Sequence, residues 1–120
     1  MNIEVNKNYR NVISIELVGE KVTKENIAKI EETVAALHEK IDDIHFIILI
    51  GSGSSISLKA IYEVLKMAVK EHKFIHKVAI VAHSNFIKAG VKLDNLTLPW
   101  QEKYFDIDAV NEAWDWVTVE

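Results

Sequence analysis

The sequence predicts an α/β fold with a mixed, mostly parallel sheet, and three observations support this class. The runs 46–50 and 78–82 are uniformly apolar, as expected of strands covered on both faces. Segments with a helical spacing of apolar residues separate the later strands, and strands joined through helices pair in parallel. The first two predicted strands alternate between apolar and polar residues instead, which indicates a hairpin with an antiparallel strand at the edge of the sheet.

The N-terminal part is expected to form this hairpin and an amphipathic helix. Residues 2–6 and 12–18 alternate around a polar turn at 7–10. Thr23 is a suitable N-cap, because its hydroxyl can accept a hydrogen bond from a backbone amide in the first turn of a helix. Apolar residues then recur at spacings of three and four, at Ile27, Ile30, Val34, Leu37 and Ile41.

Two further strand–helix units are expected in the middle of the chain. The strand 46–50 leads into a small, polar stretch whose last residue, Ser57, can cap a second helix. The apolar stripe of that helix consists of Leu58, Ile61, Leu65 and Ala68. The strand 78–82 is followed by a short predicted helix over 85–91 and an irregular apolar segment over 93–100.

The C-terminal end is expected to form a short strand, Tyr104-Phe105, and a helix that Asp106 or Asp108 caps. The predicted element order is therefore ββαβαβαβα. Ala113 permits the last helix to pack closely, and Trp114 lies on the same helix face as Val110, four residues earlier. These residues are sufficient to hold the last helix on the sheet without any further role.

The same C-terminal residues resemble the SpoIIAA-like (STAS-type) family, whose members typically end with a Tyr/Phe-Phe-Asp strand end and a Glu-Ala-x-x-Trp helix. Here these motifs read Tyr104-Phe105-Asp106 and Glu112-Ala113-Trp114-Asp115-Trp116. The segments 46–50 and 77–82 also look like the third and fourth strands of that family. The resemblance covers essentially the whole chain, and it implies a fold related to anti-sigma-factor antagonists and to the cytoplasmic domains of anion transporters.

The resemblance also implies a candidate phosphorylation site. In the antagonist branch, a serine at the start of the second helix is phosphorylated within a pattern that is roughly Asp-Ser-Ser-Gly-Leu. The matching stretch here is Ser54-Ser55-Ile56-Ser57-Leu58, which places Ser55 at the phosphorylated position. The stretch departs from the pattern, because Ser54 replaces the aspartate, Ile56 the second serine and Ser57 the glycine.

Composition limits the classes of function. The 120 residues are 49% apolar, which is enough for one core, and we expect a single domain over 1–120. The chain has no cysteine, which excludes disulfides and fits a cytoplasmic protein. A net charge of −4 with scattered basic residues predicts no nucleic-acid binding. No window approaches the ~20 apolar residues of a membrane span.

The serine-rich stretch after the strand 46–50 is the most suggestive local sequence for a ligand or partner site. It would lie outside the carboxyl end of the sheet, where ligands of α/β folds gather. Its candidate contact residues are Ser52, Gly53, Ser54, Ser55 and Ser57. The alternatives are an ordinary connection with a serine cap, an anion or partner contact, and a nucleotide site. The nucleotide site lacks support, because neither a third glycine nor a Gly-Lys-Ser/Thr sequence is present.

Catalysis and metal binding are weaker predictions. Ser55 and His83 could approach one sheet edge, but the loop is not a Gly-x-Ser-x-Gly elbow and no acidic residue is placed to orient the imidazole. The pair His72 and His76 is expected to be split by a helix end, so we expect no metal site. We also expect no cofactor.

Residues 84–100 are more apolar than a surface connection needs. They either cover the sheet or leave an apolar patch or pocket for a second subunit or an apolar ligand. The candidate residues for that patch or pocket are Phe86, Leu93, Leu96 and Trp100. The leading functional hypothesis is a non-catalytic, regulatory STAS-like module that binds a protein or senses a ligand, as a homodimer. A carrier of a small apolar or lipid-like ligand and a Ser/His hydrolase are the alternatives.

Overall fold

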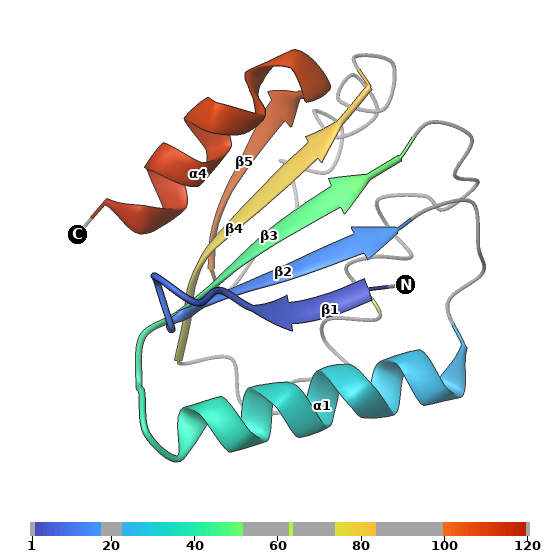
Figure 1. Ribbon diagram of the computed structural model, residues 1–120, viewed down its shortest axis with the longest axis vertical. Coiled ribbons are helices and arrows are strands. Elements are labelled where there is room, and N and C mark those ends of the chain that lie inside the picture. Colours follow the sequence, from blue (N-terminus) through green and yellow to red (C-terminus); the bar gives the residue numbers. More distant parts are fainter. Residues whose placement is uncertain (1, 18–22, 52–62, 64–73, 84–99, 120) are drawn as a thin grey trace.

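The computed structural model describes residues 2–17, 23–51, 63, 74–83 and 100–119. Within these residues, five strands form one sheet in the order β1-β2-β3-β4-β5 (Figure 1). The strands are β1 (Asn2–Val5), β2 (Val12–Leu17), β3 (Ile44–Ile50), β4 (Ile75–Ala82) and β5 (Gln101–Asp106). Strand β1 pairs with β2 in the antiparallel sense, and every other neighbouring pair is parallel. The predicted mixed sheet with an antiparallel edge strand is thus confirmed.

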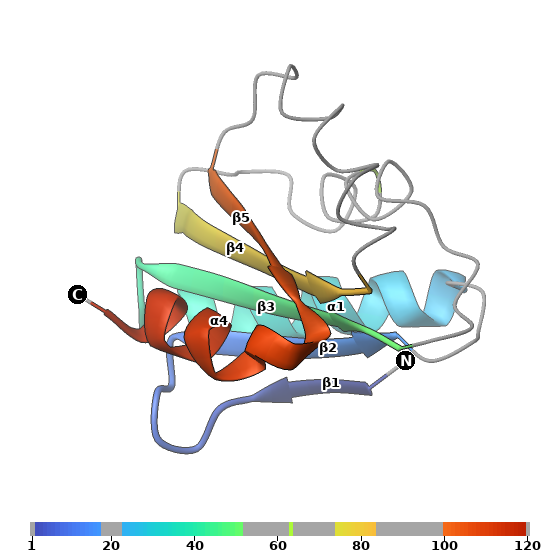
Figure 2. The same cartoon turned by 90° about the horizontal axis from the view of Figure 1, so that it is seen from above.

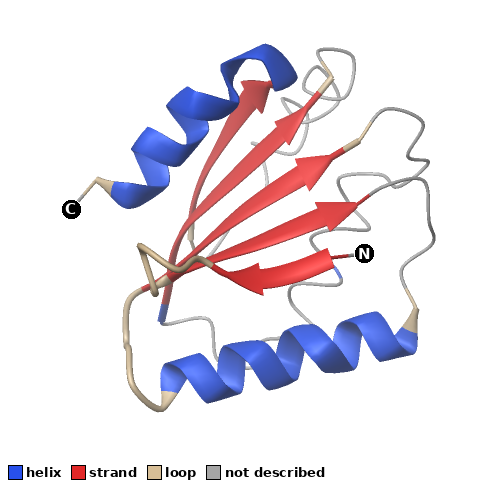
Figure 3. Ribbon diagram, viewed as in Figure 1, coloured by secondary structure: helices blue, strands red, loops and turns tan. Residues whose placement is uncertain are grey.

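Helix α1 (Lys24–His38) covers one face of the sheet (Figure 3). Its start confirms the prediction for Thr23, whose hydroxyl accepts a hydrogen bond from the Asn26 amide at 3.2 Å. The Asn26 side chain accepts one in return from the Thr23 amide at 3.0 Å, which completes a capping box. The helix ends earlier than predicted, because the backbone turns back onto the Leu37 carbonyl and leaves Ile41 outside the helix.

The opposite face carries the C-terminal helix. A short 3-10 helix, η3 (Ile107–Ala109), follows β5 directly and continues into α4 (Val110–Thr118). Asp106 caps η3 by accepting a hydrogen bond from the Asp108 amide at 3.1 Å. Of the two predicted caps, Asp106 is therefore the one that performs this role. Seen from above, α1 and α4 lie on different sides of the sheet (Figure 2).

Two apolar cores follow from this layering. Side chains of β2, β3 and β4 alternate between the faces, so that Phe46 and Ile48 belong to the α1 core and Ile47 to the α4 core. Both faces of β3 and β4 are covered, which explains why the sequence of these strands is almost continuously apolar. Burial alternates along β1, and the side chains of Glu4 and Glu16 are exposed. This part of the sheet therefore has one face in contact with solvent.

Strand β5 is longer than the predicted Tyr104-Phe105 pair, since it begins at Gln101. The polar residues at its start gave no apolar signal, but the edge position permits them, because one side of the strand faces solvent. The predicted second helix and the predicted helix over 85–91 lie outside the described residues, except for Glu63, which is helical and exposed.

Candidate functional site

The carboxyl ends of the central parallel strands lie at one edge of the sheet, as the sequence predicted. Leu49 and Val81 are direct partners in the register of β3 and β4. Gly51 and the exposed His83 therefore leave the sheet at the same edge. The serine-loop residues Ser52, Gly53, Ser54, Ser55 and Ser57 lie outside the described residues, and so do Phe86, Leu93 and Leu96. The predicted meeting of Ser55 with His83, and the phosphorylation of Ser55, stay predictions.

Trp100 is the one member of the predicted apolar patch that the structure describes. Its side chain is 6% exposed and belongs to the α1-face core. Trp100 precedes β5 directly, and Glu102 and Tyr104 follow on the same face at a spacing of two. For this residue the structure supports the interpretation that the apolar segment contributes to the core.

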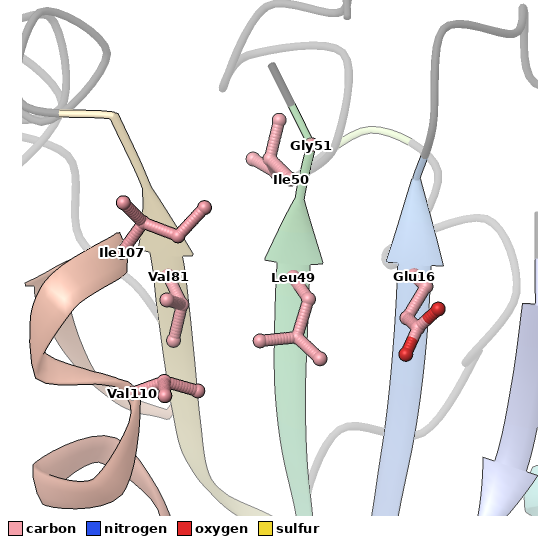
Figure 4. Close-up of a pocket in the computed structure, with 7 residues that line it drawn as sticks. All are labelled: Glu16, Leu49, Ile50, Gly51, Val81, Ile107 and Val110. Atoms are coloured by element: carbon pink, nitrogen blue, oxygen red, sulfur yellow. The ribbon is translucent and has the colours of Figure 1, made fainter.

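An apolar pocket of about 260 Å³ lies on the α4 face at the carboxyl edge. Figure 4 shows Leu49 at its centre, with Val81 on one side and Glu16 on the other. The described lining comes from β2, β3, β4, η3 and the first turn of α4, and consists of Glu16, Leu49, Ile50, Gly51, Val81, Ile107 and Val110. The serine-rich stretch begins at Gly51, so the pocket adjoins the surface predicted from the sequence.

The register of the sheet explains how the pocket acquires one polar and one apolar side. Glu16 pairs with Leu49, Leu49 with Val81 and Val81 with Phe105. These four residues form one row across the α4 face, beginning with an exposed carboxylate and ending at a buried ring. Helix α4 contacts β4 most extensively, followed by β3 and β5, and the Glu16 side chain at the β2 end of the row is exposed.

Ile107 forms the outer wall of the pocket. It is 47% exposed, although it is one of the largest apolar side chains of the described surface. The Asp106 cap fixes the backbone of η3 and thereby presents Ile107 at the mouth of the pocket. The motifs of the sequence did not point to this residue. One feature of the sequence could have identified it. Ile107 lies between two aspartates in a capped turn, where its apolar side chain is not part of the apolar stripe of a helix.

A second polar cluster lies at the opposite, amino edge of the sheet. Asp43 lies between two imidazoles, with one oxygen 3.4 Å from His45 Nε2 and the other 3.5 Å from His76 Nε2. His45 is almost fully buried, and desolvation lowers its pKa from the ordinary 6.5. The nearby Asp43 carboxylate opposes this lowering of the pKa, while Lys77 and His76 add to it. Among the described residues, no group of three or more histidines and carboxylates is arranged to hold a metal ion.

A third polar group lies on the α1 face of β5. The Tyr104 hydroxyl donates a hydrogen bond to Glu102 Oε2 at 2.8 Å. Glu102 pairs with Val78 in the register, next to the buried Phe46 of β3. Burial raises the pKa of Glu102 from 4.5 to about 7, and the Tyr104 hydrogen bond opposes the shift.

The described part of the chain contains no helix long and apolar enough to cross a membrane. Comparison with curated proteins and with solved structures gave no significant match. The model of the SpoIIAA-like family, in contrast, matches residues 12–118, which include β2 to β5 and both described α-helices. The sheet order and the C-terminal motif agree with that match, and the chain belongs to the SpoIIAA-like family.

Proposed function

We propose that this chain is a non-catalytic, regulatory STAS-type module that binds a protein partner, or senses a ligand, with the carboxyl edge of its sheet. Membership of the SpoIIAA-like family supports a module of this kind. The observation that carries the proposal is the open apolar pocket beside Gly51, where β3 leads into the serine-rich stretch. Contiguous apolar surface at the edge of a sheet commonly marks an interaction site.

The chemistry of the pocket supports binding more than catalysis. Among its described lining residues, Glu16 alone carries an ionisable side chain, and the others are apolar or glycine. Within the described lining, the Glu16 carboxylate has no nucleophile or imidazole beside it, so this part of the pocket can orient a ligand but offers no pair for proton transfer. The proposal therefore assigns recognition to this surface.

Site-specific photo-crosslinking tests the assignment. A benzophenone amino acid would replace Ile107 at the pocket or, as the control, Tyr9 in the turn between β1 and β2. The two native side chains are equally suited to this exchange, with exposed fractions of 47% and 49%. We expect covalent adducts with a partner in the source cells from position 107 and none from position 9. Adducts from position 9 alone, or from neither position, would contradict the proposal.

We further propose that the module is a cytoplasmic homodimer, as the cysteine-free composition and the apolar character of residues 84–100 suggest. Sedimentation velocity over a hundredfold range of protein concentration tests this. The alternative function, a carrier of an apolar ligand beneath residues 84–100, predicts a co-purified ligand in native mass spectra. A single mass that corresponds to the chain alone would count against the carrier.

A further inference from the structure

We infer that the pocket on the α4 face receives one large apolar side chain of a partner protein, and that a lysine or arginine beside that side chain contacts Glu16. This inference rests on the proposed function and gives the chemistry of the partner. Three features of the described structure carry it: the composition of the pocket walls, the size of the pocket, and the distribution of charge around it.

The walls favour an aliphatic or aromatic side chain. Leu49 and Val81 form the floor, and Ile107 and Val110 form the wall beside them (Figure 4). Ile107 remains about half exposed without a partner. An incoming apolar side chain would remove both this residue and the partly exposed Leu49 from water, which is favourable in proportion to the apolar area buried.

The size of the pocket favours a single side chain over a whole apolar molecule. Pockets for drug-sized ligands commonly measure roughly 300–1,000 Å³. The volume here, about 260 Å³, lies just below that range, and Glu16, the lining residue from β2, is exposed. A peptide can insert one anchor residue into such a pocket and lay its neighbouring residues over the adjoining surface.

Charge around the pocket favours a basic peptide. Glu16 lines the pocket itself, and Asp108 is exposed on the η3 side. The part of the α4 face next to the pocket is formed by β1 and β2, where Glu4 is also exposed. Acidic side chains therefore occur on both sides of the apolar floor, and a cationic partner would be attracted and correctly oriented.

The basic side chains of the described strands already have other contacts. Strands β1 to β5 contain two of them, Lys77 and Lys103. Lys77 donates to backbone carbonyls at the end of α4, at the amino edge of the sheet. Lys103 lies 5.4 Å from the centre of the Phe105 ring. Neither is among the described residues that line the pocket, so within the described part of the chain the positive charge opposite Glu16 is left to the partner.

The test uses the full chain and three fluorescent decapeptides. The first has a central leucine flanked by lysines; the second replaces the lysines by glutamates; the third keeps the lysines and replaces the leucine by serine. We expect fluorescence anisotropy to show at least about tenfold tighter binding of the first peptide than of either other peptide, which corresponds to a difference of about 1.4 kcal/mol. Added salt should weaken the binding of the first peptide.

A matched pair of variants and one charge reversal test whether the peptide binds at the pocket. Ile107→Asp should weaken binding of the leucine–lysine peptide at least about tenfold, whereas Tyr9→Asp, an equally exposed site at the other edge, should leave it unchanged. Glu16→Lys should reverse the preference between the lysine and glutamate peptides. Circular dichroism and urea unfolding would confirm that each variant is folded.

The outcomes separate this inference from the proposed function. The inference is wrong if no peptide binds at millimolar concentration, if the glutamate peptide binds as well as the lysine peptide, or if Ile107→Asp binds like the unchanged chain. A dimer that Ile107→Asp converts to a monomer would also overturn it, because a second copy would then cover the pocket. The proposed function would survive any of these results as long as crosslinks from position 107 to a partner, or to that second copy, are found.

Discussion

The ammonium nitrogen of Lys77 lies 3.0 Å from the carbonyl oxygen of Trp116 and donates a hydrogen bond to it. It also donates to the Val119 carbonyl at 2.9 Å and lies 5.5 Å from the centre of the Trp116 ring. The last carbonyls of a helix have no partner within the helix and carry the negative end of its dipole. A lysine on β4 thus caps α4 across the interface between helix and sheet.

Replacing Lys77 by methionine should therefore destabilise the chain. Both hydrogen bonds involve a charged donor, but the one to Trp116 is only partly buried and the one to Val119 is exposed, so we expect a loss of about 1–2 kcal/mol in the free energy of unfolding. Urea unfolding at pH 7 measures the change. Lys103→Met is the matched control, because Lys103 is an exposed lysine on the neighbouring strand, and it should cost less than ~0.5 kcal/mol. Equal effects of the two variants would contradict the capping role.

Glu102 should make the chain less stable as the pH rises. Its pKa is raised from 4.5 to about 7 on folding, so between these pH values the folded state holds a proton that the unfolded state has lost. The stabilisation is complete below pH 4.5 and is lost as the pH rises to 7 and above. Glu102→Gln, which cannot ionise, should be more stable than the unchanged chain at pH 8, by about 1–2 kcal/mol after allowance for partial exposure.

The comparison for Glu102 needs two pH values and one control. The advantage of Glu102→Gln should disappear at pH 4.5, where the carboxyl is protonated in the folded state. Asn111→Gln, which exchanges one exposed amide on α4 for another, should show no such difference between pH 4.5 and pH 8. A Glu102→Gln variant that is less stable than the unchanged chain at pH 8 would show that the carboxylate is well solvated or paired.

His45 should have the opposite effect on the pH dependence of stability, because it should make the chain less stable as the pH falls. Burial lowers its pKa below 6.5, so the folded state favours the neutral imidazole. The resulting stability is present above pH 6.5 and is lost as the pH falls through the folded pKa. His45→Phe should therefore remove part of the loss of stability between pH 7.5 and pH 5, as measured by urea unfolding. His76→Gln, at a side chain that is 54% exposed, should leave most of that loss in place.

Thr23 and Thr33 give a test of the α1 cap within one helix. Thr23→Ala removes the hydroxyl that accepts from the Asn26 amide and should cost about 1 kcal/mol. Thr33→Ala removes a mid-helix hydroxyl bonded to the Lys29 carbonyl and should be neutral or slightly stabilising, because alanine has the higher helix propensity. Thermal unfolding by circular dichroism distinguishes the two. Similar losses in both variants would contradict the specific role of the cap.

Most of the sheet could be predicted from local patterns. The continuous apolar run of β3 and the alternation of β2 differ because one strand is covered on two faces and the other is partly wet. The cap at Thr23 and the cap at Asp106 could also be predicted, since each depends on residues two or three positions away. The start of β5 could not, because Gln101 and Lys103 carry no apolar signal and are accepted only at an edge.

The candidate site was predicted only as an edge of the sheet. The sequence indicated that the parallel strands would end together, and the register of Leu49 with Val81 confirms this. It did not indicate that Ile107 would lie at the mouth of a pocket or that Glu16 would line the same pocket. Those two residues are 91 positions apart in the chain (107 minus 16), and no local pattern relates them.

The sequence alone thus determined the fold class and the succession of the described strands along the chain. These follow from the periodicity of apolar residues and from caps, which are properties of short segments. The family was indicated by the resemblance of the C-terminal motif, and the match of the family model over residues 12–118 shows it. Only the tertiary structure decided which residues share a surface, how Lys77 meets the end of α4, and how burial shifts the pKa values of His45 and Glu102 in opposite directions. Desolvation and contact depend on the residues that the fold brings together from distant parts of the chain.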